Sequence, residues 1–172
     1  MGTLLTPRTD PATATEIRPE VRKGMGANEG LAGFGPDVIL LGLNATLSDN
    51  FREVMPQVRG GRPFADVTEE TETYRQWLAD LLLATGFAVL LVTVRAARWR
   101  DVTIRWIREK TGGVPTKSYF NSSGTRIPHL AKQAMLGKLI LPAVPRESLI
   151  AFESNERKRK MFRGRGIGSS LD

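Results

Sequence analysis

The sequence contains no cysteine and a single histidine, His129. The absence of cysteine excludes a disulfide framework, a cysteine-based zinc site and a thiol nucleophile. One histidine, which we expect at the surface near a helix start, argues against a metal site built from several imidazoles. The longest apolar run, residues 87–92, is far shorter than the roughly 20 residues that span a bilayer, and Leu4-Leu5 is too short for a signal-peptide core. We therefore expect a cytoplasmic protein without a membrane segment.

The composition is that of an ordinary globular protein with an excess of positive charge. The chain has 172 residues, of which 41% are hydrophobic and 25% are charged, and its formal net charge is +7. This length fits one domain with a sizeable core. A net charge of this sign favours a polyanionic surface or an acidic partner without deciding between them.

Residues 1–35 combine threonine, proline, glycine and mixed charge without an apolar periodicity. We interpret them as an extended N-terminal arm that gains order against neighbours in an assembly. The domain is predicted to cover residues 36–168, and residues 169–172 are predicted to form a tail.

Apolar runs alternate with segments of helical spacing along the predicted domain. Val38–Leu41 and residues 87–92 are continuous apolar runs, which are typical of strands buried on both faces in a parallel sheet. Residues 51–67 contain two prolines and two glycines, which predicts an irregular connection. Further strands are predicted at 114–120 and 148–152, and helices at 68–85, 98–110, 128–138 and 155–163, with Trp77, Trp99 and Trp106 on inner helix faces. The alternation predicts an α/β fold with a mostly parallel sheet flanked by helices.

The turn after the first predicted strand carries Gly42-Leu43-Asn44-Ala45-Thr46-Leu47. This frame resembles the first motif of the haloacid dehalogenase-like (HAD) phosphohydrolases, in which a hydrophobic strand runs into Asp-x-Asp-Gly-Thr-Leu. Later segments resemble the other three motifs in the family's order. Thr93 resembles the hydroxyl residue that binds the substrate phosphate, Lys132 the motif III lysine, and Glu153-Ser154 the acidic motif IV. The likeness is greatest to the compact phosphatase domain of phage polynucleotide kinases, and it implies a Rossmann-like HAD fold without a large cap domain.

The departures from these motifs fall where the family's chemistry is concentrated. The resemblance implies a nucleophilic aspartate at position 42 and an acid/base aspartate at position 44, but Gly42 has no side chain and Asn44 cannot exchange a proton at neutral pH. Magnesium requires anionic oxygen ligands, and only Glu153 or Asp49 supplies a carboxylate nearby. No cofactor or metal is therefore expected, and removing members of a cooperating catalytic unit removes nearly all of its benefit.

Two groups of residues remain candidates for binding. Thr93, Arg95 and Lys132 are candidates for an anion site, although Thr93 and Lys132 are equally explained as inherited positions and Arg95 as a structural donor to loop carbonyls. The predicted helix at 155–163 and the residues after it form a basic cluster that suits polyanion or acidic-protein contact, or simply a solvated face. The basic cluster consists of Arg157, Lys158, Arg159, Lys160, Arg163 and Arg165.

These observations favour an inactive HAD-like pseudoenzyme that serves as a structural or binding component of a larger assembly. Protein partners are expected, with nucleic acid contact through the basic cluster, and the likeness to phage enzymes favours a virion or phage–host complex. Two alternatives remain open. One is a phosphatase acting on nucleic acid 3′-phosphates or other phosphomonoesters through a replacement nucleophile such as Asp49, and the other is a nucleic-acid-binding regulator.

Overall fold

The structure is a computed structural model that describes residues 38–113, 115–125 and 127–170. The expected arm at residues 1–35 lies outside the described residues. Within them, five parallel strands form one sheet in the order β3-β2-β1-β4-β5. The strands are β1 (Val38–Leu41), β2 (Ala88–Ala96), β3 (Lys117–Asn121), β4 (Leu149–Phe152) and β5 (Gly168–Ser170). The sheet confirms the predicted α/β class and is consistent with a Rossmann-like fold.

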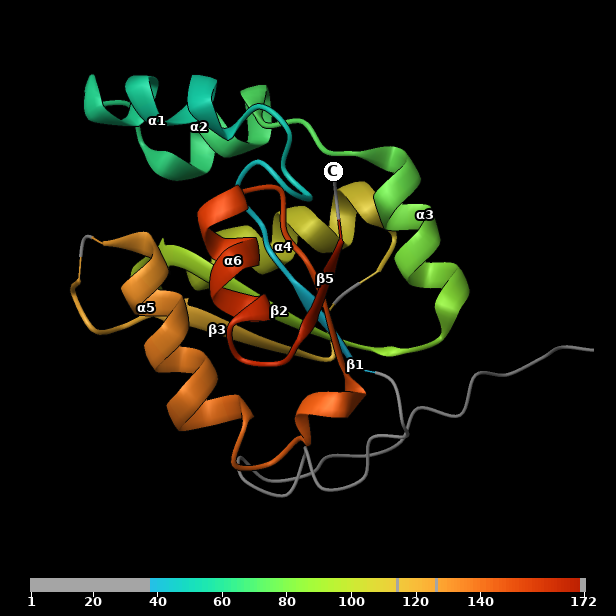
Figure 1. Cartoon of the computed structure of the whole chain (residues 1–172). Coiled ribbons are helices and arrows are strands. Elements are labelled where there is room, and N and C mark those ends of the chain that lie inside the picture. The colour runs from blue at the N-terminus through green and yellow to red at the C-terminus, as the bar shows by residue number, and fades with distance from the viewer. Residues whose placement is uncertain (1–37, 114, 126, 171–172) are drawn as a thin grey trace, which may run out of the picture. The chain divides into compact units, whose positions relative to one another are not determined.

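Helices connect successive strands and cover both faces of the sheet (Figure 1). They are α1 (Phe51–Arg59), α2 (Phe64–Thr71), α3 (Gln76–Thr85), α4 (Arg100–Thr111), α5 (Pro128–Met135) and α6 (Glu156–Arg163), with short turns at Ala97–Trp99, Leu136–Ile140 and Arg146–Ser148. On one face, Leu40 and Leu90 pack with residues of α5 and α6 such as Met135 and Phe162. On the other face, Leu41 and Leu91 pack with α3 and α4. None of the helices in the described part of the chain is long and apolar enough to cross a membrane.

The central strand forms as its sequence predicts. All four residues of β1 are buried, and the strand pairs with β2 on one side and β4 on the other. An uninterrupted apolar run is suited to this position because helices cover the sheet on both faces. The carboxyl ends of β1, β2 and β4 consequently lie side by side, which brings together the residues that follow them.

The expected irregular connection at residues 51–67 is wrong, because this segment forms α1 and the first half of α2. Pro56 lies inside α1, and the other three residues that suggested a loop mark the helix boundaries. Gly60 caps the end of α1, Gly61 has a φ of 99°, and Pro63 precedes the first turn of α2. Apolar side chains of the two helices pack with each other and with Trp99 and Val102. The α1–α2 hairpin follows the carboxyl end of β1 (Figure 1).

The helix predicted at 68–85 is interrupted. The chain leaves α2 after Thr71, and α3 begins only at Gln76. The end of α3 agrees with expectation, since Gly86 caps it with a left-handed φ of 64°. Trp77 was expected on the inner face but is 53% exposed, because Leu78 and Ala79 form the buried face of the helix. Trp106 is buried as predicted.

β2 is longer at its carboxyl end than the predicted strand, and β5 forms where no strand was predicted. β2 continues through Thr93 and Arg95 to Ala96, with an irregular register opposite β3. The expected domain end at residue 168 falls inside β5, whose residues Ser169 and Ser170 pair with β4. His129 lies in the first turn of α5 and is exposed, as expected.

Candidate functional site

The turn after β1 holds the first of the predicted site residues. The backbone N–H of Gly42 donates to the carbonyl of Phe152 at 2.9 Å, which continues the pairing of β1 with β4. Ala45 adopts a φ of 60°, a left-handed conformation that costs a residue with a Cβ about 1–2 kcal/mol. Arg75 supports this turn, since its Nε donates to the carbonyl of Thr46 at 2.9 Å and its Nη2 to that of Ala45 at 3.4 Å. Arg75 was not singled out from the sequence, because these contacts join residues 29 and 30 positions apart.

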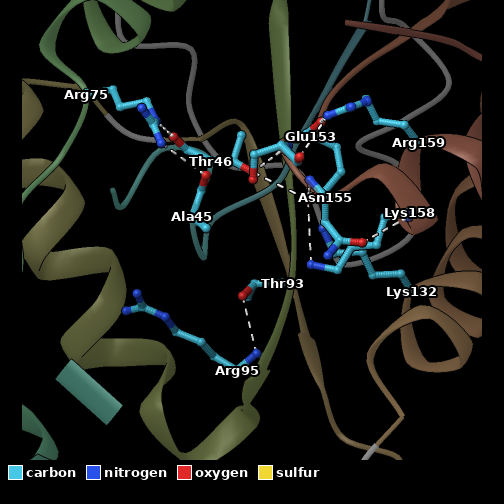
Figure 2. A network of polar contacts seen from close by, with 11 residues as sticks. Ala45, Thr46, Arg75, Thr93, Arg95, Lys132, Glu153, Asn155, Lys158 and Arg159 are labelled. Carbon is cyan, nitrogen blue, oxygen red and sulfur yellow. Dashed lines mark hydrogen bonds and ion pairs between the residues drawn. The ribbon is translucent and has the colours of Figure 1, made fainter. Parts of the chain in front are cut away.

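The centre of the site is the carboxylate of Glu153, which follows β4 and is fully buried (Figure 2). Nζ of Lys132 donates to Oε2 of Glu153 at 2.5 Å, and Nζ of Lys158 lies 3.5 Å from Oε1. The backbone N–H of Asn155 donates to Oε1 at 3.1 Å, and Oγ1 of Thr46 lies 3.5 Å from the same oxygen. We refer to Glu153, Lys132, Lys158, Asn155 and Thr46 as the Glu153 cluster.

The pKa values of the charged groups reflect this packing. Burial alone would raise the pKa of the Glu153 carboxyl, but the ammonium groups of Lys132 and Lys158 outweigh it and hold that pKa below its usual value. Burial lowers the pKa of Lys132 to about 8, because the attraction of Glu153 offsets the loss of hydration only in part. A single carboxylate therefore compensates the positive charge of two buried ammonium groups.

Position 42 has no room for a side chain while Glu153 is present. A Cβ built on Gly42 would lie 2.8 Å from Oε2 of Glu153 and 2.9 Å from Oγ1 of Thr46. Both distances are shorter than real Cβ contacts. The carboxylate of Glu153, which follows β4, thus occupies the space that a side chain at position 42 would enter.

A second buried ion pair joins β2 to the segment between α2 and α3. Nη2 of Arg95 donates to Oε1 of Glu72, and Nη1 donates to Oε2 at 3.2 Å. Both side chains are fully buried, and the guanidinium also lies 4.7 Å from the ring centre of Phe51 in α1. Nε of Arg95 donates to Oδ1 of Asn44 at 2.8 Å. Nη1 of Arg95 also lies 3.4 Å from Oγ1 of Thr103, so Arg95 bonds to three side chains and not to the loop carbonyls that were expected.

The three candidate anion-binding residues do not form one free surface. The side chain of Lys132 is 2% exposed and pairs with Glu153. Arg95 is neutralised by Glu72. The Oγ1 of Thr93 accepts the backbone N–H of Arg95 at 3.2 Å, within a buried part of β2. Anion binding at these residues stays a prediction, and it would require an anion to compete with two internal carboxylates.

The residues at the strand ends do not fit a magnesium ion, which the HAD resemblance implies. Gly42 offers no oxygen from a side chain, and Oδ1 of Asn44 is bound to Arg95. The carboxylate of Glu153 faces two ammonium groups. Nowhere in residues 38–113, 115–125 and 127–170 do three acidic or histidine side chains gather as metal ligands.

The described hydrogen bonds of Asp49 are with Thr73 and not with the Glu153 cluster. Its side chain accepts the hydroxyl of Thr73, and its backbone N–H donates to the carbonyl of the same residue at 3.2 Å. Asp49 is exposed and attached to the segment between α2 and α3. The replacement nucleophile considered from the sequence is therefore held away from Glu153 by local hydrogen bonds.

The predicted basic cluster is divided between the two sides of α6. Lys158 is buried against Glu153, and Nη1 of Arg159 donates to the carbonyls of Ser154 at 2.7 Å and of Glu153 at 3.3 Å. The cluster is therefore not a purely solvated face, because Lys158 points inward to a carboxylate. Arg157, Lys160 and Arg163 are exposed, and Arg165 is half-buried.

A separate cavity of about 200 Å³ lies between α3, α4 and the adjoining strands. Its walls are apolar and include Leu83, Phe87, Val89 and Ile107. No member of the Glu153 cluster is among its described lining residues. The cavity is therefore distinct from the strand-end site.

Comparison with known proteins finds solved structures of similar fold. No protein-family model matches the chain, and no curated protein matches it in sequence. A chain in the structure of the Pnkp1/Rnl/Hen1 RNA repair complex superposes with a TM-score of 0.60 over 82% of the present chain, at 15% identity. A chain in another structure of the Pnkp1/Rnl/Hen1 complex gives a TM-score of 0.56 over 94% of it, also at 15% identity.

The present chain spans only about half of these matched chains, covering 45% and 55% of their lengths. Identity of 15% is too low to carry over activity or residue roles. The likeness shows that the chain shares its α/β fold with a component of an RNA repair complex.

Proposed function

We propose that the chain is a catalytically inactive relative of the HAD phosphohydrolases that acts as a binding or structural component of a larger assembly. The observation that carries this proposal is that the Glu153 carboxylate fills the space that a side chain at position 42 would need. A nucleophile must reach the phosphorus atom of its substrate. Glu153 is fully buried and held by Lys132, so it is paired internally where the family resemblance places an attacking group.

The polar groups around the site support the same proposal. Asn44 has an amide where a general acid would be needed, and its oxygen is already bound to Arg95. Internal partners satisfy the lysines and the arginine that could have stabilised a transferring phosphoryl group. The charged groups of the network are therefore engaged with one another and less available to a substrate phosphate.

The role in an assembly is supported by the comparisons and by the surface. The matched chains belong to multi-protein complexes and are about twice as long as the present chain. α3 also exposes the large apolar side chains of Trp77, Leu81 and Leu83, a feature typical of surfaces that meet other proteins. A phage virion or phage–host complex is the setting that the sequence resemblance favours.

The proposal predicts no phosphatase turnover above background with magnesium, on either aryl phosphates or 3′-phosphorylated oligonucleotides. The measurement is inorganic phosphate released per protein molecule over several hours, at several stages of purification. Thr93→Val provides a matched control, because turnover at the strand-end site would fall in this variant while turnover by a contaminant would not. Activity that persists through purification and falls in Thr93→Val or in Asp49→Asn would overturn the proposal and favour the phosphatase alternative.

A further inference from the structure

The side of α6 that faces away from the core carries basic side chains that are not packed into the core. Lys158 and Phe162 face inward, and Arg159 bonds to backbone carbonyls at the end of β4. The remaining basic side chains point away from the core. We define the α6 surface as Arg157, Lys160, Arg163 and Arg165.

Acidic side chains compensate little of this charge. Glu156 pairs with Lys160 at 2.8 Å, and both side chains are about two-thirds exposed, so the pair is weak. Among the described residues, no acidic side chain forms an ion pair with Arg157, Arg163 or Arg165. Burial of these guanidinium groups against a polyanion would relieve their mutual repulsion.

The backbone beside the α6 surface is open at Gly166 and Gly168. Gly164, Gly166 and Gly168 alternate with larger residues after the helix, and a Cβ on Gly166 or Gly168 would meet no atom within 4 Å. β5 lies next to α6 and forms the last strand of the described sheet, so one of its edges is unpaired by any described strand (Figure 1). Nη1 of Arg163 donates to the hydroxyl of Ser169 at 3.4 Å, which places an arginine over this edge.

We propose that the α6 surface binds the sugar–phosphate backbone of a nucleic acid without reading its sequence. Three of its four cations are arginines, whose planar guanidinium groups bind phosphate through two parallel hydrogen bonds. The serine hydroxyl and open backbone of β5 are further groups of the kind that contact phosphates. Phe162, the aromatic residue of α6, is buried and offers no platform for base stacking. The surface lies outside the Glu153 cluster, so this proposal stands or falls independently of the inactivity proposed above.

The test is fluorescence anisotropy of labelled 20-base-pair duplexes of DNA and RNA, of two unrelated sequences each, titrated with the full chain between 50 and 200 mM salt. With up to four phosphate contacts, the logarithm of the association constant for DNA should fall against the logarithm of salt with a slope of about −3 to −4. Arg157→Gln and Arg163→Gln should each weaken binding of every sequence and reduce the slope by about 1. Arg108→Gln makes the same change of charge on the exposed last turn of α4 and should change neither quantity.

A competitor distinguishes nucleic acid from an acidic protein. Unlabelled duplex should displace the labelled probe at far lower charge concentration than polyglutamate. Equal displacement by polyglutamate, equal losses in Arg108→Gln and Arg163→Gln, or an unchanged salt slope in the α6 variants would each overturn the proposal. Unfolding curves should stay unchanged in all three variants, since each removed side chain is exposed.

Discussion

Replacing Glu153 with glutamine is expected to lower the free energy of unfolding by about 3–5 kcal/mol. The substitution preserves the size of the side chain but leaves Lys132 and Lys158 buried together without a counter-charge. The loss should be largest near neutral pH. Because the folded-state pKa of Glu153 is lowered, its contribution is present above the usual glutamate pKa of about 4.3 and disappears as the pH falls through the folded value. Denaturant unfolding of both proteins across pH 3–8 measures this difference.

Two companion variants make the result specific to the buried charge. Glu156→Gln removes an exposed carboxylate from an ion pair on the same helix and should leave the free energy of unfolding nearly unchanged. Adding Lys132→Met to Glu153→Gln should recover much of the loss, since an apolar side chain of similar length replaces an unpaired buried charge. A cost for Glu153→Gln no greater than that for Glu156→Gln would show that the carboxylate does not sustain the cluster.

Removing the carboxylate of Glu72, by Glu72→Gln, is expected to cost about 3–5 kcal/mol and to loosen the α1–α2 hairpin first. The guanidinium of Arg95 would remain fully buried on β2 without its counter-ion. Glu72 follows the last residue of α2, and Arg95 also contacts the rings of Phe51 and Phe64. Amide hydrogen exchange should therefore accelerate in α1 and α2 well before it does in β1.

Arg62→Met is the matched control for this pair. Arg62 and Glu70 form an ion pair of the same residue types beside the same hairpin, but their side chains are 43% and 60% exposed. This variant should change stability by less than about 1 kcal/mol and leave exchange in α1 and α2 unaltered. Uniform acceleration across the sheet in Glu72→Gln, or equal costs for the two variants, would contradict a role of the pair in fixing the hairpin.

The elements that the sequence predicts well are those with strong local signals. The apolar run of β1 and the left-handed glycine that ends α3 each define a structure within a few residues. The α1–α2 hairpin was missed because glycines and prolines at helix ends are the same residues that occur in loops. The break before α3 depends on Glu72 reaching Arg95, which is 23 residues away in the sequence.

The candidate site shows a similar division. The motif frame correctly predicts that residues 42 and 153 directly follow neighbouring strands, whereas Thr93 lies inside β2, which continues to Ala96. The orientation of Lys158 could not be predicted, since a basic run on a helix is ordinarily solvated, and only the position of Glu153 makes an inward lysine favourable. The proximity of the Glu153 carboxylate to Gly42 is likewise a property of three-dimensional packing, because nothing in either segment records the distance between them.

The central claim is that the Glu153 carboxylate fills the space of a residue 42 side chain and serves there as counter-ion to Lys132. The most direct test is the difference in unfolding free energy between Gly42→Asp/Glu153→Ala and Gly42→Asn/Glu153→Ala. The two double variants have side chains of nearly the same shape at position 42, and only the first restores a carboxylate. The account predicts that the aspartate variant is more stable than the asparagine variant by about 1.5–3 kcal/mol, the contribution of a hydrogen bond to a charged group. Equal stabilities of the aspartate and asparagine variants would contradict it.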